Sequence, residues 1–581
     1  MKKKCSIILI LWLLQLITLP QIMAQEIKIK IITTTDVHGG IAPYDFIENV
    51  NLNYSLAQVH TYIKKQRADS SQTVILLDNG DILQGQPIVY YYNFEKTDGT
   101  HILADVMNFM QYDAGTVGNH DIETGHPVYD KLVKQFNFPW MAANAVDSVT
   151  QKPYFKPYTV FTIDTVKVAV LSLITPAIPL WLPQNIWSGM YFEDMVESAK
   201  KWVEIIKNQE QPHILIGLFH AGLDYNYNGQ TEETWKNENG TKLIAEKVAG
   251  FDIIFAGHDH QSYNSTISNY LSKSVLVLDG KSGAKMVSEV TIVLKNNNGV
   301  LEKKISGKLV EMSDFEADSE FMTKFSPAFQ EVKDYITQPI GTFTKSINTR
   351  DALFGPSEFT DLIHTFQLSI TQADISFASP LSFNAEIKQG TVFVRDMFKL
   401  YRFENLLYTM QLSGKEIKDY LEFSYGNWFN EMYSENDHLL MFETNLYGDS
   451  ILKTPYYNYS SAAGINYFVD ISKPIGQRVT ITSLTNGSEF KEADLYTVAV
   501  NSYRGNGGGG HLTEGSGIPQ DKLAERIITS TELDLRFYLM KWIKEKQEIT
   551  PVPLNNWHVV PENYWKKGKE RDFRILFNWQ Y

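Results

Sequence analysis

Cysteine and positive charge are what this sequence has little of. A single cysteine, Cys5, occurs in 581 residues, and it lies in an N-terminal stretch that we expect to be removed. The mature chain would then need neither disulfides nor thiol chemistry. The 53 lysine and arginine residues are outnumbered by 67 aspartate and glutamate residues. The net charge of −14 argues against a nucleic-acid polymer as partner. It does not exclude a nucleotide, because bound cations would reverse the charge locally.

Long hydrophobic runs are also scarce, apart from Ile7–Leu19, which follows Lys2–Lys4 and precedes Ala24. This order predicts a secretory signal peptide at 1–24, cleavage before Gln25, and a secreted, periplasmic protein. The alternative is a membrane anchor, but the run is short for a bilayer span. No later run resembles a membrane span, so we expect no membrane anchor after cleavage. We also expect a monomer.

A chain of this length without internal repeats is expected to form at least two domains. From Ile27 to about Leu309, short apolar runs alternate with amphipathic stretches such as 55–67 and 192–208, which indicates a layered α/β domain. Strands are expected at Ile27–Thr33, Thr73–Leu77, Ala114–Val117, Lys167–Leu173, Ile214–Phe219, Ile253–Ala256 and Ser274–Leu278.

The remainder of the chain predicts a second domain behind a helical connection. Glu316–Tyr335 has the pattern of a polar, amphipathic helix, and proline and glycine follow it. The expected division is a first domain at 25–315, an interdomain helix at 316–341, a second domain at 342–550 and a packed aromatic-rich tail at 551–581. Strands of the second domain are expected at Ile375–Ala378, Thr391–Arg395, Leu407–Leu412, Tyr467–Ile471, Val479–Leu484 and Leu495–Asn501.

Five short polar clusters each close an apolar run of the first domain. They are Thr35-Asp36-Val37-His38-Gly39, Asp78-Asn79-Gly80-Asp81, Gly118-Asn119-His120-Asp121, His220-Ala221-Gly222 and Gly257-His258-Asp259-His260. Ligand sites in α/β sheets form at the carboxyl ends of strands, so residues far apart in sequence can meet there. Carboxylates, an amide and imidazoles are suitable ligands for zinc, manganese or iron. Two such metals roughly 3.5–4 Å apart are typical of phosphate-ester hydrolysis.

The individual residues suggest distinct tasks. A lone Asp-x-His or His-Ala-Gly is ordinarily a polar turn, but five clusters at strand ends are hard to explain in that way. His120 follows the candidate ligand Asn119, so it should project beside the metals, where it can contact a phosphoryl group or protonate a leaving oxygen. Glu123 could orient its imidazole, and Asp121 is a rival for that task. Glu123 could equally be a solvent-facing residue at a helix start.

At these residues the chain resembles the calcineurin-like metallophosphoesterases, and more narrowly the 5′-nucleotidase family. The clusters, together with Asp78–Pro87 and Ala143-Asn144-Ala145, occur in the order typical of that family. The resemblance extends over nearly the whole mature chain. It implies a four-layer α/β/β/α metallophosphoesterase domain joined by a helix to a C-terminal α/β substrate-binding domain.

The resemblance also implies two divalent metal ions of the Zn, Mn, Fe or Co class. One would be held by Asp36, His38, Asp81 and His260. The other would be held by Asp81, Asn119, His220 and His258, with Asp81 shared between them. His120 would be the catalytic histidine. The family commonly places an aspartate three residues after it, where this chain has Glu123.

Members of the family clamp a nucleobase between two aromatic rings. The matching positions here are Tyr459 and Tyr503, and the second lies in the loop 501–510, which also supplies Asn501, Gly508 and Gly509 as candidate substrate contacts. Stacking on an aromatic ring contributes roughly 1–3 kcal/mol per base. The alternative is that both tyrosines pack a core.

Two departures from the 5′-nucleotidases bear on the substrate. Gly509 stands where they place an aspartate that holds the ribose hydroxyls, and 378–383 lacks their phosphate-binding arginine. The chain is closer to the 2′,3′-cyclic-nucleotide 2′-phosphodiesterase/3′-nucleotidase branch, which Tyr401–Leu407 and Ser413–Leu421 also fit. The predicted activity opens 2′,3′-cyclic nucleotides to 3′-nucleotides and dephosphorylates these to nucleosides.

Two alternatives stay open at this point. One is a 5′-nucleotidase or a nucleotide-sugar hydrolase, and the other is a nucleotide-binding protein without catalysis. Because the metal clusters and the base clamp lie on different domains, a domain movement is expected during turnover.

Overall fold

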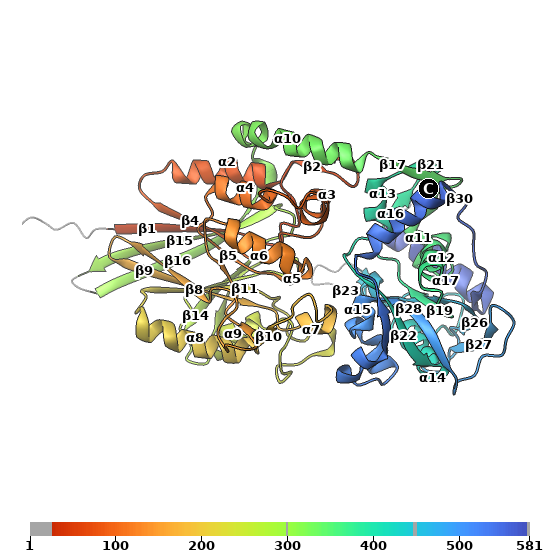
Figure 1. The fold of residues 1–581 in the computed structure, drawn as a ribbon. Coiled ribbons are helices and arrows are strands. Elements are labelled where there is room, and N and C mark those ends of the chain that lie inside the picture. The colour runs from red at the N-terminus through yellow and green to blue at the C-terminus, as the bar shows by residue number, and fades with distance from the viewer. Residues whose placement is uncertain (1–25, 298–299, 445–449, 578–581) are drawn as a thin grey trace, which may run out of the picture.

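A computed structural model describes residues 26–297, 300–444 and 450–577 of the chain. The predicted signal peptide at 1–24 lies outside these residues. Among the described residues, no helix is both long and apolar enough to cross a membrane. The described chain forms two bodies that lie side by side, with a long helix along one edge (Figure 1).

Two six-stranded sheets form the centre of the N-terminal domain. The first has the order β16 (Val300–Glu311), β15 (Met286–Asn297), β1 (Glu26–Thr34), β4 (Thr73–Asp78), β5 (Ala114–Thr116) and β6 (Trp140–Met141). The second has the order β13 (Tyr263–Ser268), β14 (Ser274–Asp279), β12 (Ile253–Ala256), β11 (Ile214–His220), β9 (Val166–Ile174) and β8 (Tyr158–Ile163). Apolar side chains of both sheets, among them Ile31 and Ile75 of the first and Val170 and Ile216 of the second, share one buried cluster. The seven strands predicted for this domain are all present, whereas the long β15–β16 hairpin was not predicted.

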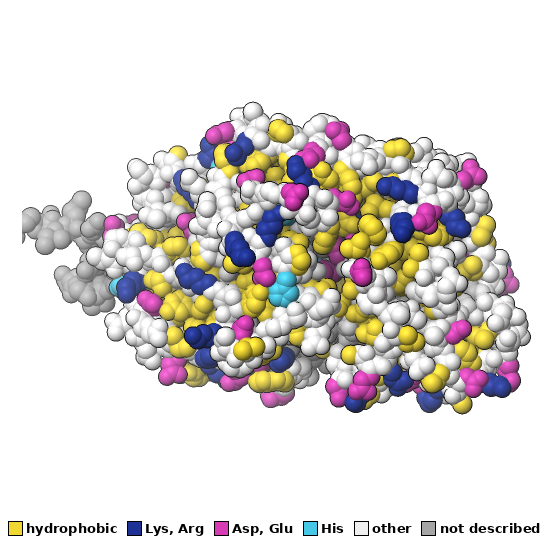
Figure 2. All heavy atoms as spheres, in the orientation of Figure 1, with side chains coloured by type: hydrophobic (Ala, Val, Ile, Leu, Met, Phe, Trp, Pro, Cys, Tyr) yellow, Lys and Arg dark blue, Asp and Glu magenta, His cyan; other side chains and the backbone are white. Residues whose placement is uncertain are grey.

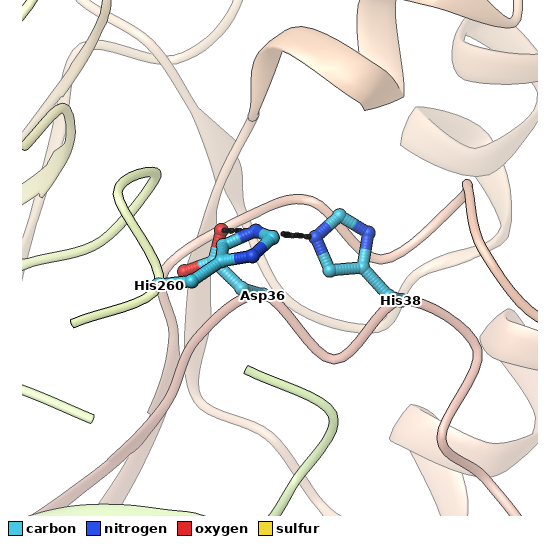
Figure 3. A group of neighbouring side chains, drawn as sticks. All are labelled: Asp36, His38 and His260. Atoms are coloured by element: carbon cyan, nitrogen blue, oxygen red, sulfur yellow. Dashed lines mark hydrogen bonds and ion pairs between the residues drawn. The ribbon is translucent and has the colours of Figure 1, made fainter. Parts of the chain in front are cut away.

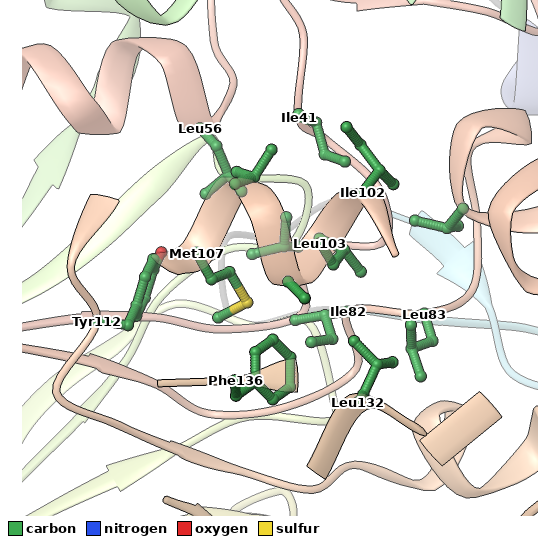
Figure 4. Close-up of a cluster of buried hydrophobic side chains, with 14 of the residues drawn as sticks. Ile41, Leu56, Ile82, Leu83, Ile102, Leu103, Met107, Tyr112, Leu132 and Phe136 are labelled. Carbon is green, nitrogen blue, oxygen red and sulfur yellow. The ribbon is translucent and has the colours of Figure 1, made fainter. Parts of the chain in front are cut away.

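Helices cover the outer face of each sheet. The helices α2 (Leu56–Arg67), α4 (Ile102–Met110) and α6 (His126–Gln135) contribute to the large cluster beside the first sheet, part of which Figure 4 shows. The helices α8 (Met195–Gln209) and α9 (Thr241–Lys247) contribute to a separate cluster with the second sheet. Figure 1 shows the two groups of helices on opposite sides of the sheets. The layer order is therefore α/β/β/α, as predicted.

Parallel pairing brings the polar clusters together. Strands β1, β4, β5 and β6 are parallel in the first sheet, and β9, β11, β12 and β14 are parallel in the second. The carboxyl ends of parallel neighbours lie at one edge of a sheet. Backbone hydrogen bonds then join the loops at that edge, as from Asp36 N–H to Gly80 O (3.0 Å) and from His38 N–H to Asp81 O (3.0 Å).

The long helix α10 (Ser319–Ile336) connects the two bodies (Figure 1). It begins where the Asp318 carboxylate accepts the Phe321 N–H, and it buries Phe321, Phe325 and Phe329 at a spacing of four residues. This spacing aligns the rings on one face, which packs into the N-terminal cluster. The helix lies inside the interval 316–341 predicted for the connection, whereas the exact domain boundaries stay a prediction.

The C-terminal domain is also α/β. Its central sheet has the order β25 (Ser461–Ala463), β19 (Ile375–Ala378), β28 (Leu495–Asn501), β22 (Leu407–Ser413) and β29 (Ile527–Ser530). Helices such as α12 (Glu358–Thr371) and α14 (Gly414–Gly426) pack around it. The end of the chain is more than a packed tail, because β31 (Trp557–Val560) pairs in parallel with β26 (Ile465–Asp470), and α17 (Glu562–Phe577) follows.

Basic and acidic side chains are interspersed on the face shown in Figure 2. Lysine and arginine do not gather there into a broad basic surface.

Candidate metal centre and substrate pocket

The predicted metal ligands stand out by their backbone conformation. Asp36, His38, Asp81, His258 and His260 all have positive φ angles, between 47° and 78°. Residues other than glycine adopt such angles uncommonly, and strained conformations of this kind cluster at functional sites. Five of the seven predicted ligands are therefore among the sixteen non-glycine residues of the described chain that adopt a positive φ.

The first ligand group consists of Asp36, His38 and His260 (Figure 3). The Nε2 atoms of His38 and His260 lie 2.9 Å apart, and Asp36 Oδ1 lies 3.5 Å from His260 Nε2. The Nδ1–H of His38 donates to Gln84 O at 2.9 Å, so its Nε2 carries the lone pair in the neutral ring. Burial and the neighbouring His260 lower the pKa of His38 to about 3, which keeps this ring neutral and able to bind a cation.

The second ligand group consists of Asp81, His220 and His258. The Nδ1–H of His220 donates to Asn79 O at 2.7 Å, so its Nε2 faces Asp81 Oδ2 at 3.1 Å and Asn119 Oδ1 at 3.1 Å. Burial lowers the pKa of His220, but the Asp81 charge outweighs burial and the pKa rises to about 10. The buried pair therefore favours a positive charge at this point.

These two groups fit divalent cations. In each of them imidazole nitrogens and carboxylate oxygens converge, with ligand atoms within 4.8 Å of one another. In the second group, Asp81 Oδ2 and Asn119 Oδ1 are acceptors that face His220 Nε2. Because His220 Nδ1 carries the proton donated to Asn79 O, Nε2 of the neutral ring is a third acceptor. A metal ion can satisfy three such atoms at once, and mixed oxygen and nitrogen ligation suits zinc, manganese and iron.

Glycine at 118 allows the second group to form. A Cβ atom at this position would overlap Oδ1 and the backbone N of Asp81. The backbone at Gly118 therefore approaches the Asp81 carboxylate more closely than any other residue could.

His120 lies beside the metal groups and contacts Glu123. Its backbone N–H donates to Asp81 Oδ1 at 2.8 Å, and its Nδ1 lies 2.5 Å from Glu123 Oε2. Burial lowers the pKa of His120, but the charges of Asp81 and Glu123 outweigh burial and raise the pKa to about 9. The imidazolium form is thus favoured.

Asp121 has a different task from Glu123. Its carboxylate accepts the backbone N–H groups of Gly118, Asp81, Ile82 and Leu83 at 2.8–3.0 Å. These bonds tie the Asp81 loop to the start of the helix that carries His120. Asp121 is thereby committed to the backbone, and Glu123 is the carboxylate that contacts the His120 ring.

A pocket of about 600 Å³ joins the metal groups to the C-terminal domain. His38, Asp81, His120 and His258 line it from the N-terminal domain. Phe403, Tyr457, Asn501, Tyr503 and Gly509 line it from the C-terminal domain. The volume is in the range of ordinary ligand pockets. Asn501, Tyr503 and Gly509 thus lie where a substrate contact requires them.

Tyr459 corrects the predicted base clamp. Its side chain is only 1 % exposed, belongs to a hydrophobic cluster and stacks on Trp428 with the ring centroids 5.0 Å apart. It does not line the pocket, whereas Tyr457, two residues earlier, does. Gly508 is likewise buried behind the pocket, where it receives an Arg504 guanidinium hydrogen bond on its carbonyl.

The glycine at 509 has a structural cause. Its φ is 70°, and a Cβ atom there would overlap Arg504 Nη1. The buried Arg504 guanidinium also donates to Tyr457 O (2.7 Å) and to Asn458 Oδ1 (2.9 Å). The space that an aspartate side chain at 509 would need is therefore occupied by the residue that fixes the Tyr457 segment.

Trp181, Glu238 and Arg402 are among the pocket residues that the sequence did not predict. Trp181 stacks on the His258 ring, Glu238 contacts the same histidine, and Arg402 is the only lysine or arginine among the described residues that line the pocket. None of them follows a predicted strand as the ligand clusters do. Of the three, only Arg402 lies in a segment that the sequence analysis singled out, 401–407.

Comparison with known proteins agrees with this architecture. The calcineurin-like phosphoesterase family matches residues 29–262, and the 5′-nucleotidase C-terminal domain family matches residues 339–514. A trifunctional nucleotide phosphoesterase of Bacillus subtilis is 25% identical over 93% of this chain, which spans only 39% of that longer protein. A 2′,3′-cyclic-nucleotide 2′-phosphodiesterase/3′-nucleotidase of Yersinia enterocolitica is 24% identical over 93% of this chain and 89% of its own length.

A solved structure supports the fold in the same way. That of a 5′-nucleotidase precursor from Thermus thermophilus has a TM-score of 0.62 and 21% identity, and the match covers 92% of this chain and all of that one. The match therefore extends over both domains of this chain in the same order. The chain therefore combines a calcineurin-like phosphoesterase domain with a 5′-nucleotidase C-terminal domain, and it is a metal-dependent phosphoric ester hydrolase.

Proposed function

We propose that this chain is a secreted dinuclear-metal enzyme that opens 2′,3′-cyclic nucleotides to 3′-nucleotides and then dephosphorylates these to nucleosides. The observation that carries the choice of substrate is Gly509. Because Arg504 fills the space beside it, no carboxylate at 509 can hold free 2′ and 3′ hydroxyls. A ribose whose phosphate bridges 2′ and 3′ has no such hydroxyls to hold. The names of relatives such as the Yersinia enterocolitica enzyme support the same choice.

The proposed ligands follow from the two groups. Asp36, His38 and His260 would hold one ion, and His220, His258 and Asn119 would hold the other, with Asp81 between them. Bound divalent ions would supply charge neutralisation for the phosphoryl oxygens and would acidify a water molecule. The leader with Lys2–Lys4 supports secretion.

His120 would complete the reaction as a proton donor. With Nδ1 held by Glu123, its Nε2 is the atom left for the substrate, and the Glu123 carboxylate raises the pKa of the ring and so favours its protonated form. In the first step the oxygen of a water molecule would bond to phosphorus as the bond from phosphorus to O2′ breaks, the Nε2 proton would pass to O2′, and a proton of the water would leave to solvent. In the second step a further water molecule would displace O3′ from phosphorus, and His120 Nε2 would donate its proton to O3′.

Phosphate release tests the proposal directly. The purified protein, loaded with Mn²⁺ or Zn²⁺, is given 2′,3′-cyclic AMP, 3′-AMP and 5′-AMP in parallel, and chromatography of the cyclic AMP reaction detects any 3′-AMP that accumulates. We expect turnover of the first two substrates and little of the third. Preference for 5′-AMP would favour the 5′-nucleotidase alternative, and nucleotide binding without turnover of any substrate would favour the non-catalytic one.

The corrected base clamp gives a further prediction. Tyr457→Ala removes a ring that lines the pocket, and stacking contributes roughly 1–3 kcal/mol per base, so we expect KM for 3′-AMP to rise about 5–150-fold with little change in kcat. Tyr459→Phe is the matched control. It removes a buried hydroxyl that has no hydrogen-bond partner among the described residues, and its KM should stay at the wild-type value. An unchanged KM in Tyr457→Ala would contradict the corrected clamp.

A further inference from the structure

Glu238 is a pocket carboxylate whose position is fixed by its own loop. Its backbone N–H donates to Gln230 Oε1 at 2.9 Å, and its carbonyl accepts from Thr175 Oγ1 at 2.9 Å. The neighbours Asn237 and Asn239 are buried and bonded to the same loop. The Glu238 side chain is itself only 12% exposed, although it lines the pocket. A carboxylate so placed has little freedom to seek other partners.

The partner that Glu238 finds is His258. The carboxylate Oε1 lies 3.3 Å from His258 Nε2, and the Trp181 ring stacks on the imidazole with centroids 5.6 Å apart. Trp181 therefore contacts the face of the His258 ring, and Glu238 contacts its edge at Nε2. When Nε2 carries the proton that Glu238 accepts, Nδ1 of the neutral ring carries the lone pair.

Two other ligand histidines are oriented by the backbone. His38 donates from Nδ1 to Gln84 O, and His220 donates from Nδ1 to Asn79 O. Both therefore present Nε2 to a metal. His258 uses a side chain instead of a carbonyl, and it uses its Nε2, so its tautomer depends on one replaceable group.

We propose that Glu238 is a positioning residue that accepts the Nε2–H of His258 and so fixes the tautomer that presents Nδ1 to the second metal ion. This inference rests on the proposed metal centre. Carboxylate–histidine–metal arrangements orient the ring and raise its basicity, and loss of such a partner typically lowers metal affinity about 10–100-fold. Glu238 would then act on the reaction through His258 rather than by contact with the substrate.

Metal titration tests the inference without any substrate. Chelator-treated wild type, Glu238→Ala, Glu238→Gln and the control Glu233→Gln are titrated with Co²⁺, followed by calorimetry and visible absorption. Glu233 is an exposed carboxylate of the same loop. We expect Glu238→Ala to weaken one of two sites about 10–100-fold and to leave the other unchanged. Glu238→Gln, whose amide oxygen can still accept the Nε2–H, should stay within a few-fold of wild type, as should Glu233→Gln.

Two results would overturn the inference. One is unchanged affinity of both sites in Glu238→Ala together with a raised KM for 3′-AMP, which would make Glu238 a substrate contact. The other is a crystal structure of the Zn²⁺-loaded wild type in which His258 binds through Nε2, and this measurement stands even if Glu238→Ala fails to fold. A wild type that binds no Co²⁺ would contradict the metal centre itself, so the two failures are distinguishable.

Discussion

The Asp81→Asn variant is expected to lose both metal sites at once. Its carboxylate contacts the second ligand group through Oδ2, 3.1 Å from His220 Nε2, and its Oδ1 accepts the His120 N–H at 2.8 Å. Burial opposes the charged form, but the imidazoles of His220 and His120 outweigh it and hold the pKa of Asp81 well below its usual range. An uncharged amide removes that negative charge from the middle of the site.

Loss of a residue that only orients a metal ligand lowers metal affinity about 10–100-fold. We expect the loss in Asp81→Asn to be larger, because Asp81 is itself a proposed ligand. Metal content per chain after dialysis, with phosphate release measured on the same samples, checks it. Asp130→Asn is a suitable control. The Asp130 carboxylate pairs with His126 at a distance of 3.1 Å, and neither residue lines the pocket. An Asp81→Asn protein that retains two ions and full activity would contradict both the shared ligand and the mechanism.

The ligand clusters could be predicted because their geometry follows from topology. Each closes a buried strand, and parallel pairing places the ends of such strands at one edge whatever lies between them in sequence. Asp36 and His260 could thus be placed together although 223 positions separate them. Their positive φ angles could not be foreseen, because strain of this kind is imposed by the folded surroundings.

The base clamp could not be resolved in the same way. Tyr457 and Tyr459 are two positions apart, so an extended strand would have placed both on one face. The chain instead forms a short turn of 3-10 helix at Tyr456–Asn458 before it becomes extended at Tyr459. That change of conformation turns one ring to the pocket and the other to Trp428. Pro455 and Asn458 favour a turn here, but they do not indicate which of the two rings faces the pocket.

Glu238 illustrates a third limit. It lies in the long connection between β11 and α9, whose path is set by hydrogen bonds among its own polar side chains. The sequence does not indicate that Glu238, rather than Glu232 or Glu233, contacts His258 of another loop. Contacts between two loops depend on the fold as a whole, so they have no local pattern.

The His120→Ala variant is expected to separate chemistry from metal binding. His120 is not a member of either ligand group, and its ring contacts Glu123 rather than a ligand oxygen. Loss of a positioned general acid costs typically about 10²–10⁴-fold in rate, so kcat for 3′-AMP should fall by that factor. Metal content should stay at the wild-type level, in contrast to Asp81→Asn.

Glu123→Gln refines the assignment of the proton donor. An amide can still contact Nδ1 of His120, but it no longer supplies the charge that helps to raise the pKa of this histidine. We therefore expect kcat to lie between wild type and His120→Ala, and we expect the double variant to be no slower than His120→Ala alone, because Glu123 would act only through the imidazole. Steady-state kinetics of the four proteins under saturating metal completes this cycle. Additive losses in the double variant would show that Glu123 reaches the substrate or the metals by a route of its own.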